Sequence, residues 1–542
     1  MKKLLVTSAL PYANGPIHLG HLVEYIQTDI WVRYWKLRGR DAVYFCADDT
    51  HGTPVMLRAR DEGITPEQLI DRMRQEHLRD FGGFQVRFDN YYTTHSEYNR
   101  QLACGIYQAL RDGGHIVERT IRQTWCDRCA MFLPDRYIRG TCPRCGAQDQ
   151  YGDSCESCSA TYNPTELKNA RCAQCGGAPT LRESEHLFVR LSDFADRLRA
   201  WLASGAVQEE IVNKLEEWLA PGLQDWDISR DAPYFGFEIP GKPGKYFYVW
   251  LDAPIGYMAS TMDWCVRNGV SFDTYWRSSD EAEVVHFIGK DIVYFHTLFW
   301  PAMLMAAGYR TPSRVCVHGF LTVNGQKMSK SRGTFIMAGT YLAHLDPQYL
   351  RYYYAAKMTP RVEDIDLSFE DFVNRTNAEL VSKIANIPSR TLAIIHQGCG
   401  GRLGTMDAAG RQLVAEINDS RATVAASYEA RDFAQALRTV NSLADRINGY
   451  LQASKPWELV KSDAPRAASA CTAALNAFRT VAMLLSPVLP RFAEKVAAML
   501  NLPALRWDDD APLEERPVNT YERLVERVDR RKVDAMVQAA RQ

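Results

Sequence analysis

Pro16-Ile17-His18-Leu19-Gly20-His21 joins an apolar segment at residues 3–7 to an amphipathic segment at about 18–37. A second apolar segment at 42–47 follows, and the polar residues 48–52 come directly after it. The apolar segments predict strands and the amphipathic one predicts a helix, so together they make a βαβ unit. In open α/β sheets, ligands lie beyond the carboxyl ends of the strands. We therefore expect the quoted stretch and the loop at 48–52 to border a binding site.

His18 and His21 are three residues apart at the start of the predicted helix, so their side chains share one face. Gly20 between them lets a flat base approach the backbone. Backbone N–H groups at a helix N-terminus favour phosphate, and imidazoles can donate to phosphate oxygens. Taken alone, the two histidines are explained equally well as capping or packing residues.

A second motif, Lys327-Met328-Ser329-Lys330-Ser331, lies in a polar stretch between Gly325 and Gly333. We expect a mobile loop whose lysines supply point charges for a triphosphate. Alone it would be read as a solvated basic loop. Together, the two motifs predict an ATP site at which a carboxylate attacks the α-phosphate, with catalysis by positioning and charge stabilisation. Lys330 is the first candidate for stabilising the departing pyrophosphate, and Lys327 is the second.

The composition is that of an ordinary soluble globular protein, with 542 residues, 46% apolar and 24% charged. The length suggests roughly three to four domains. A formal net charge of −1 means that any nucleic acid would bind through local basic patches. We find no run of about 18 apolar residues and no signal peptide, so we expect a cytoplasmic protein with no membrane partner.

Eight of the fourteen cysteines form four C-x-x-C pairs between residues 126 and 175. In a large chain without an export signal, this pattern predicts metal sites rather than disulfides. Four thiolates make a closed, structural zinc site, so eight make two. Free thiols or disulfides are the alternative. The eight residues are Cys126, Cys129, Cys142, Cys145, Cys155, Cys158, Cys172 and Cys175.

Residues 116–230 hold these cysteines and interrupt the alternating strands and helices. Strands are expected again at 246–250, 284–288 and 315–318. We infer one nucleotide-binding α/β fold split by an inserted zinc domain.

Beyond about residue 385 the apolar residues follow helical spacing, with Asp432 a candidate N-cap and Pro465 near a helix start. This pattern predicts a helix bundle. A last amphipathic helix, containing Leu524, Val528, Met536 and Val537, is expected to dock back on the body.

The two motifs resemble the signatures of class I aminoacyl-tRNA synthetases, with an apolar Leu19 as the second residue of the first motif. Longer stretches at 9–15, 46–54, 248–257 and 286–291 are similar to the methionyl-tRNA synthetase family, and the likeness covers almost the whole chain. The resemblance implies a Rossmann-type catalytic domain split by a zinc-binding insertion and followed by an α-helical anticodon-binding bundle. The implied boundaries are 1–115 and 231–325 for the catalytic halves, 116–230 for the insertion, 326–385 for the KMSKS loop and stem-contact region, and 386–542 for the bundle with its docking helix.

The resemblance also implies an activity. ATP with Mg²⁺ and L-methionine would give methionyl-adenylate, and methionine would pass to the terminal adenosine of initiator and elongator methionine tRNAs. It implies catalytic roles for His18, His21, Lys327 and Lys330, and ATP contacts from His18, Gly20, His21 and Lys330. It implies two zinc sites, an inner one (Cys142, Cys145, Cys155, Cys158) and an outer one (Cys126, Cys129, Cys172, Cys175).

A methionine pocket needs an apolar, polarisable lining and one anionic anchor. Leu10, Ala253, Pro254 and Ile292 are candidate aliphatic walls, and Tyr12, Trp250, Tyr257, Phe295 and His296 are candidate rings. By resemblance, Asp49 holds the substrate amino group, and Asn386, Arg390 and Trp457 read the CAU anticodon. Ordinary core packing is the alternative for each aromatic residue, with Phe295 the weakest candidate. Relatives that dimerise carry a further C-terminal domain, so we expect a monomer.

Two other functions stay open at this point. One is a class I synthetase for a different amino acid, although isoleucine, valine and leucine enzymes carry a far larger editing insertion. The other is a zinc-ribbon RNA-binding protein with an inert synthetase core. The intact HLGH and KMSKS motifs argue against this function. ATP–pyrophosphate exchange with each of the twenty amino acids separates the three.

Overall fold

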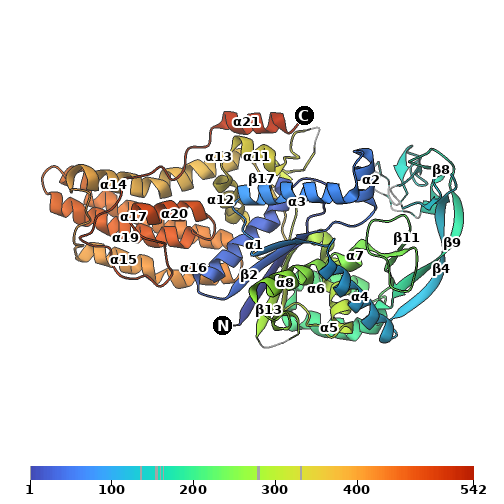
Figure 1. Ribbon diagram of the computed structural model, residues 1–542. Helices are drawn as coiled ribbons and strands as arrows, with labels where there is room; N and C mark the ends of the chain where they lie inside the picture. The colour runs from blue at the N-terminus through green and yellow to red at the C-terminus, as the bar shows by residue number, and fades with distance from the viewer. Residues whose placement is uncertain are drawn as a thin grey trace.

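The computed structural model describes residues 2–134, 137–152, 155, 157–158, 160, 162, 164–277, 281–329 and 332–541. An α/β body lies in the middle of an elongated molecule (Figure 1). A helical bundle extends from one side of this body, and a β-rich lobe projects from the other.

The body is built on a five-stranded sheet with the order β14-β13-β1-β2-β3, in which every neighbouring pair is parallel. Its strands are β1 (Lys3–Ser8), β2 (Ala42–Asp48), β3 (Asn90–Thr93), β13 (Ala282–Gly289) and β14 (Arg314–His318). The chain runs outward from β1 in one direction through β2 and β3, and in the other through β13 and β14. The strand order therefore reverses beside β1, the position at which such sheets bind ligands.

Helices cover both faces of the sheet. Helix α1 (Leu19–Leu37) packs on one face and is buried along most of its length, because helices of the bundle side cover its outer surface. On the other face lie α4 (Glu97–Asp112), α8 (Ile255–Asn268) and α10 (Trp300–Ala306). Helices α2 (Thr53–Asp61), α3 (Pro66–Gly83) and α9 (Asp273–Trp276) complete the body.

The strand expected at 246–250 is wrong in part. Only β12 (Lys245–Phe247) is a strand, and it pairs with β11 (Ser229–Asp231) outside the central sheet. The chain then turns into the short helix α7 (Val249–Asp252). The aromatic run looks like a buried strand because its rings are indeed partly buried, but tertiary contacts override local propensity here.

The β-rich lobe is a long antiparallel ribbon of β4 (Ile116–Cys126) and β9 (Thr180–Val189), flanked by β5 (Met131–Phe132) and β10 (Trp226–Asp227). A second small sheet contains β6 (Ile138–Thr141), β7 (Gln150–Tyr151) and β8 (Lys168–Cys172). Helices α5 (Ala195–Trp201) and α6 (Glu209–Leu219) lead back to the body.

A third sheet, of β15 (Leu321–Val323), β16 (Gln326–Lys327) and β17 (Ile365–Leu367), joins the body to the bundle. Between and after its strands come α11 (Ala338–His344), α12 (Pro347–Lys357), α13 (Phe369–Arg375) and a π-helical segment at Thr376–Ala385.

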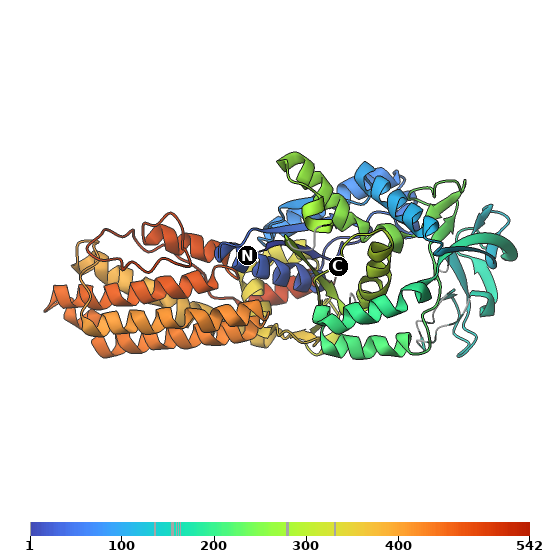
Figure 2. The same ribbon diagram turned by 90° about the horizontal axis from the view of Figure 1, so that it is seen from below.

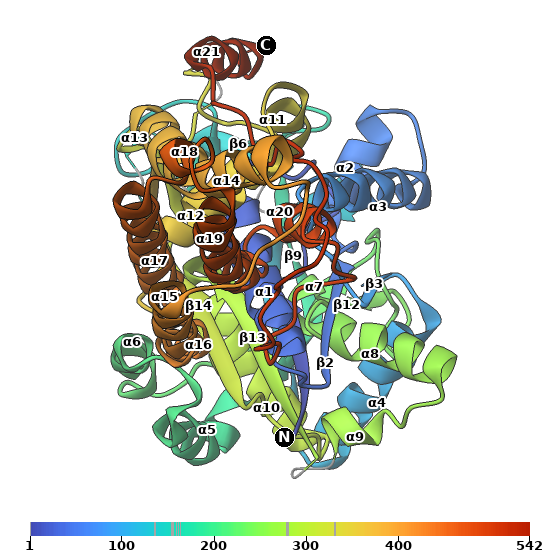
Figure 3. The same cartoon turned by 90° about the vertical axis from the view of Figure 1, so that its left-hand side faces the viewer.

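The predicted bundle is present (Figures 2 and 3). It contains α14 (Asn386–Gly398), α15 (Ala408–Asp419), α16 (Arg421–Glu429), α17 (Phe433–Ser454), α18 (Pro456–Leu459), α19 (Ala464–Leu485) and α20 (Pro490–Met499). Asp432 caps α17 by accepting the backbone N–H of Gln435, as its position predicts. Among the described residues, α19 is long and apolar enough to cross a membrane, but its most apolar window is completely buried by the surrounding helices. Its composition is therefore explained by its central place in the bundle.

The last helix, α21 (Arg530–Ala539), docks beside α11, as Figure 1 shows. Met536 lies within it and is buried, as expected. Leu524 and Val528 are also buried, but they precede the helix in a segment without regular structure. The segment buries its apolar side chains without a helical turn, because its contacts come from the bundle surface along which it runs.

Candidate active site

A cavity of about 1230 Å³ lies where the sequence places the binding site. Its wall includes residues that directly follow β1, β2, β13 and β14, at the carboxyl ends of parallel strands. The structure brings together here thirteen of the residues singled out from the sequence: Leu10, Tyr12, His18, Gly20, His21, Asp49, Trp250, Ala253, Pro254, Tyr257, Ile292, His296 and Lys327. Phe295 also lines the cavity.

The two histidines of the first motif form a stacked pair at the start of α1. Their ring centroids are 3.5 Å apart. The Nδ1 of each ring accepts the backbone N–H of the other residue at 3.3 Å, so the two form a reciprocal capping box. Burial lowers the pKa of His18 to about 4, which makes it neutral at physiological pH. A neutral ring whose Nδ1 accepts must carry its proton on Nε2. Both rings can therefore present Nε2–H as a donor.

The first part of the KMSKS motif lies against this pair. Lys327 ends β16 and lines the cavity. The terminal methyl of Met328 lies over Gly20, 2.7 Å from where a Cβ at that position would be, so the motif's side chain contacts the start of α1. Lys330 and Ser331 lie outside the described residues.

Asp49 is the candidate anchor for an ammonium group. It follows β2, is 8% exposed, and one of its carboxylate oxygens has no hydrogen-bond partner. Its backbone is held to the first loop by hydrogen bonds with Pro11 and Ala13. Burial, followed by the nearby charges of Asp252 and Asp48, raises the pKa of Asp49 well above its usual value. A cationic ligand would relieve this unfavourable burial.

Next to Asp49 the cavity is lined mainly by rings. Trp250 stacks on Phe295 with centroids 3.9 Å apart. The Tyr257 hydroxyl lies 2.9 Å from Nε2 of His296, whose Nδ1–H donates to the carbonyl of Ile292 at 3.0 Å. Nε2 therefore accepts from Tyr257, and burial lowers the pKa of His296 to about 4. The ring is an uncharged part of the wall, suited to an apolar, polarisable side chain.

Other cavity residues were not singled out from the sequence. Glu24 lies one turn after His21, where the i, i+3 spacing would have indicated it, and it accepts from the backbone of Ala9 and pairs with His318. Asp291 and His318 end or directly follow β13 and β14, so the strand-end rule would have found them. Arg230, held 3.8 Å from the ring of Tyr248, has no local signal in the sequence.

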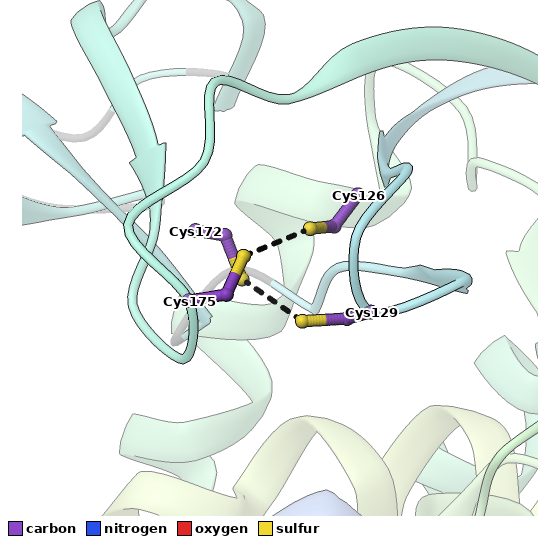
Figure 4. A group of neighbouring side chains, drawn as sticks. All are labelled: Cys126, Cys129, Cys172 and Cys175. Carbon is purple, nitrogen blue, oxygen red and sulfur yellow. Dashed lines mark hydrogen bonds between the residues drawn. The ribbon is translucent and has the colours of Figure 1, made fainter.

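The eight cysteines form two clusters in the β-rich lobe, and all fourteen cysteines are free thiols. One cluster is Cys126, Cys129, Cys172 and Cys175 (Figure 4), and the other is Cys142, Cys145, Cys155 and Cys158. Within each, the four Sγ atoms lie within 4.8 Å of one another. Tetrahedral zinc with Zn–S bonds of about 2.3 Å separates its sulfurs by roughly 3.8 Å. Both clusters therefore fit such an ion, in the grouping that the resemblance implied.

The candidate anticodon residues lie together in the bundle. Asn386 and Arg390 are one turn apart on α14. The Arg390 guanidinium lies 4.5 Å from the ring centroid of Trp457, the second residue of helix α18. Trp457 is only partly buried, so this cation–π pair presents a surface on which a nucleobase can stack.

Comparison with known proteins agrees with these features. Residues 4–392 match the family described as tRNA synthetases class I (M), and residues 400–538 match the anticodon binding domain of methionyl tRNA ligase. The chain is 56% identical over its whole length to the methionine–tRNA ligase of Thiobacillus denitrificans, of which it covers 79%. The chain belongs to the methionyl-tRNA synthetase family.

Solved structures of methionyl-tRNA synthetase from Mycobacterium tuberculosis resemble this synthetase. One in complex with methionyl-adenylate has a TM-score of 0.78 and 26% identity, and the match covers 96% of this chain and 98% of that one. The apo form has a TM-score of 0.73 and 23% identity, over 98% and 99% of the two chains. The synthetase therefore has the class I catalytic fold with a helical anticodon-binding domain.

Proposed function

We propose that this synthetase is a methionine–tRNA ligase. It forms methionyl-adenylate and pyrophosphate from L-methionine and ATP, then transfers methionine to the 3′-terminal adenosine of initiator and elongator methionine tRNAs. The observation that carries the proposal is the meeting, in one cavity, of the unpaired Asp49 carboxylate, a ring-lined apolar pocket and the paired donors His18 and His21.

Each part of the cavity then has a task in activation. Asp49 binds the substrate ammonium, and Trp250, Tyr257 and His296 surround the thioether with Leu10, Tyr12, Ala253, Pro254 and Ile292. This arrangement directs the substrate carboxylate toward the α-phosphate. The Nε2–H groups of His18 and His21 donate to phosphate oxygens as negative charge builds up, with the base above Gly20. Lys327, and Lys330 beyond it, stabilise the pyrophosphate as it leaves, and Mg²⁺ enters with the nucleotide as part of the substrate.

The remaining parts serve the tRNA and the fold. Asn386, Arg390 and Trp457 read the anticodon, and the two cysteine clusters each hold one structural zinc ion. We assign residues 1–115 and 231–325 to catalysis, 116–230 to the insertion, 326–385 to the loop and stem contacts and 386–542 to the bundle. The start of β4 at Ile116 and of α14 at Asn386 supports two of these limits, whereas the limit at 230/231 falls inside β11. Both sites lie in one chain, so a monomer suffices, and free thiols fit a reducing cytoplasm.

ATP–pyrophosphate exchange with each of the twenty amino acids tests the activity. We expect exchange with methionine alone. Exchange with another amino acid would indicate a different class I synthetase, and no exchange would favour an RNA-binding protein with an inert catalytic core.

A further inference from the structure

A buried histidine–carboxylate pair connects two segments of the methionine site. His51 Nδ1 is hydrogen-bonded to Asp252, and both side chains are completely buried although 201 positions separate them in the chain. On its other side, His51 Nε2 lies 3.0 Å from Nδ1 of His95, which is partly exposed. Neither His51 nor Asp252 is among the described residues that line the cavity, so the direct contacts proposed above do not use this pair.

The pair joins the carboxylate anchor to the apolar wall. His51 follows Asp49 by two residues, and its backbone carbonyl accepts the hydroxyl of Tyr12 at 3.0 Å. Asp252 ends helix α7, between the cavity residues Trp250 and Ala253. The hydrogen bond between the two side chains therefore fixes the distance between the ammonium site and the side-chain pocket.

Three neighbouring carboxylates, Asp48, Asp49 and Asp252, differ in their histidine partners. Asp48 has a histidine partner, His77, at 2.7 Å and accepts the hydroxyl of Tyr91. Asp252 has His51. Among the described residues, no imidazole is hydrogen-bonded to Asp49, whereas each of the three carboxylates keeps one oxygen without a hydrogen-bond partner. Burial raises the pKa of Asp252, and His51 opposes this rise.

We propose that the Asp252–His51 pair is a positioning and charge-setting element of the methionine site. His51 offsets the negative charge of Asp252, which favours the ionised form of Asp49 that receives the substrate ammonium on its free oxygen. This inference rests on the proposed function, because it assigns methionine to the cavity. The pair acts through Asp49 and does not touch substrate, so its members are positioning residues.

The proposal predicts opposite effects for the two partners. Asp252→Asn keeps an acceptor for His51 but removes a negative charge near Asp49, so Asp49 should stay ionised to lower pH. His51→Gln keeps a donor for Asp252 but leaves its charge unbalanced, so Asp49 should become protonated at higher pH. The titratable and charged groups that face this network are Asp48, Tyr12, Tyr234 and Arg230 around Asp49 and Asp252, His77 and Tyr91 at Asp48, and His95 with Glu67 and Asp71 beyond His51.

The test is the pH profile of kcat/KM for methionine in ATP–pyrophosphate exchange, from about pH 5 to 9, because this ratio reports groups of the free enzyme. We expect the acid limb to move to lower pH in Asp252→Asn and to higher pH in His51→Gln. The double variant should return it toward the wild-type position. Thermal melting of each variant checks that it is folded, and the position of the limb is independent of any uniform loss of activity.

If the pair had only a structural role, its variants would lose activity by the same factor at every pH. Limbs that stay in place, or that move in the same direction in both single variants, would overturn the proposal. Failure of the proposed function looks different, since the wild-type protein would then show no methionine-dependent exchange at any pH.

Discussion

At the scale of single residues, Asp49 is the group on which we expect substrate selection to depend most. A buried carboxylate with an unpaired oxygen is unfavourable until a cation binds, so its interaction energy is available to an ammonium group. We expect Asp49→Asn to lower kcat/KM for methionine about 100-fold, in line with the loss of one charge-assisted hydrogen bond. ATP–pyrophosphate exchange measures this, with Asp61→Asn, an exposed carboxylate on α2, as the control. An unchanged KM for methionine would show that another group binds the ammonium.

His296 illustrates how a neutral buried ring makes stability depend on pH. Its folded pKa is lowered to about 4 by burial, below the unfolded value of about 6.5. Its contribution is complete above pH 6.5, and it is lost as pH falls toward 4 because the unfolded chain binds the proton first. We expect the free energy of unfolding to fall across this window by up to about 3 kcal/mol from this residue. Urea unfolding of the wild type and of His296→Gln at several pH values measures this fall. If the free energy of unfolding depended on pH equally in both proteins, the assignment would be contradicted.

Some residues of the candidate site could be predicted from the sequence, and others could not. The places of His18, Gly20, His21, Lys327 and the strand-end Asp49 at the cavity were predictable, because short spacings and strand ends place them. The Asp252–His51 contact was not, since its partners are far apart in the chain and only the packed fold brings them together.

At the scale of elements, the two cysteine clusters lie in a lobe that has a small apolar core of its own. We expect metal analysis to give about two zinc ions per chain, because each cluster offers four thiolates. Cys175→Ser and Cys158→Ser should each reduce the content to about one, since they remove one ligand from the outer and inner site respectively. A content of about one zinc ion per wild-type chain would mean that one of the two clusters binds no metal.

The α14–α18 contact makes a second prediction at this scale. Trp457→Ala should lower kcat/KM for tRNA by about 10- to 100-fold through loss of base stacking. Methionine-dependent exchange should be unchanged, and Trp457→Phe should keep most of the activity. Equal losses in exchange and aminoacylation would show that Trp457 supports the bundle instead.

Elements were predicted best where periodicity is regular. Helical spacing of apolar residues correctly predicted α17 and α19. Short apolar segments correctly predicted the strands β1, β2, β13 and β14. The prediction was wrong at residues 246–250, where rings that belong to a pocket looked like a strand. At 524–528, apolar spacing looked helical although the segment is held by the surface beneath it.

At the scale of the whole molecule, the catalytic body and the bundle share one continuous core. Arg351 on α12 is completely buried at their junction. Its guanidinium donates to Asp29 of α1 at 2.7 Å and to the carbonyls of Phe84, Pro487 and Val488. These hydrogen bonds from Arg351 connect the bundle to the body.

We expect Arg351→Leu to destabilise the protein by about 3 kcal/mol, because it leaves buried carbonyls and the Asp29 carboxylate with fewer partners. Urea unfolding measures the effect, and Arg375→Leu, a partly exposed arginine on α13, serves as the control. A change no larger than that of the control would mean that the junction is held by apolar packing alone.

The packing at this junction sets the separation between the cavity and Trp457, which matters if both regions contact one tRNA. Helix α17 has 22 residues and spans about 33 Å, and Trp457 lies beyond its far end. The surface proposed to read the anticodon thus lies well away from the cavity, as expected of a ligase that contacts both ends of one tRNA.

The most direct measurement is therefore methionine transfer to tRNA transcripts that differ only in the anticodon. We expect that a CAU transcript is charged with methionine and that transcripts with other anticodons are charged far more slowly, while exchange without tRNA proceeds normally. Equal charging of all transcripts, or charging with a different amino acid, would contradict the assignment of this chain as a methionine–tRNA ligase.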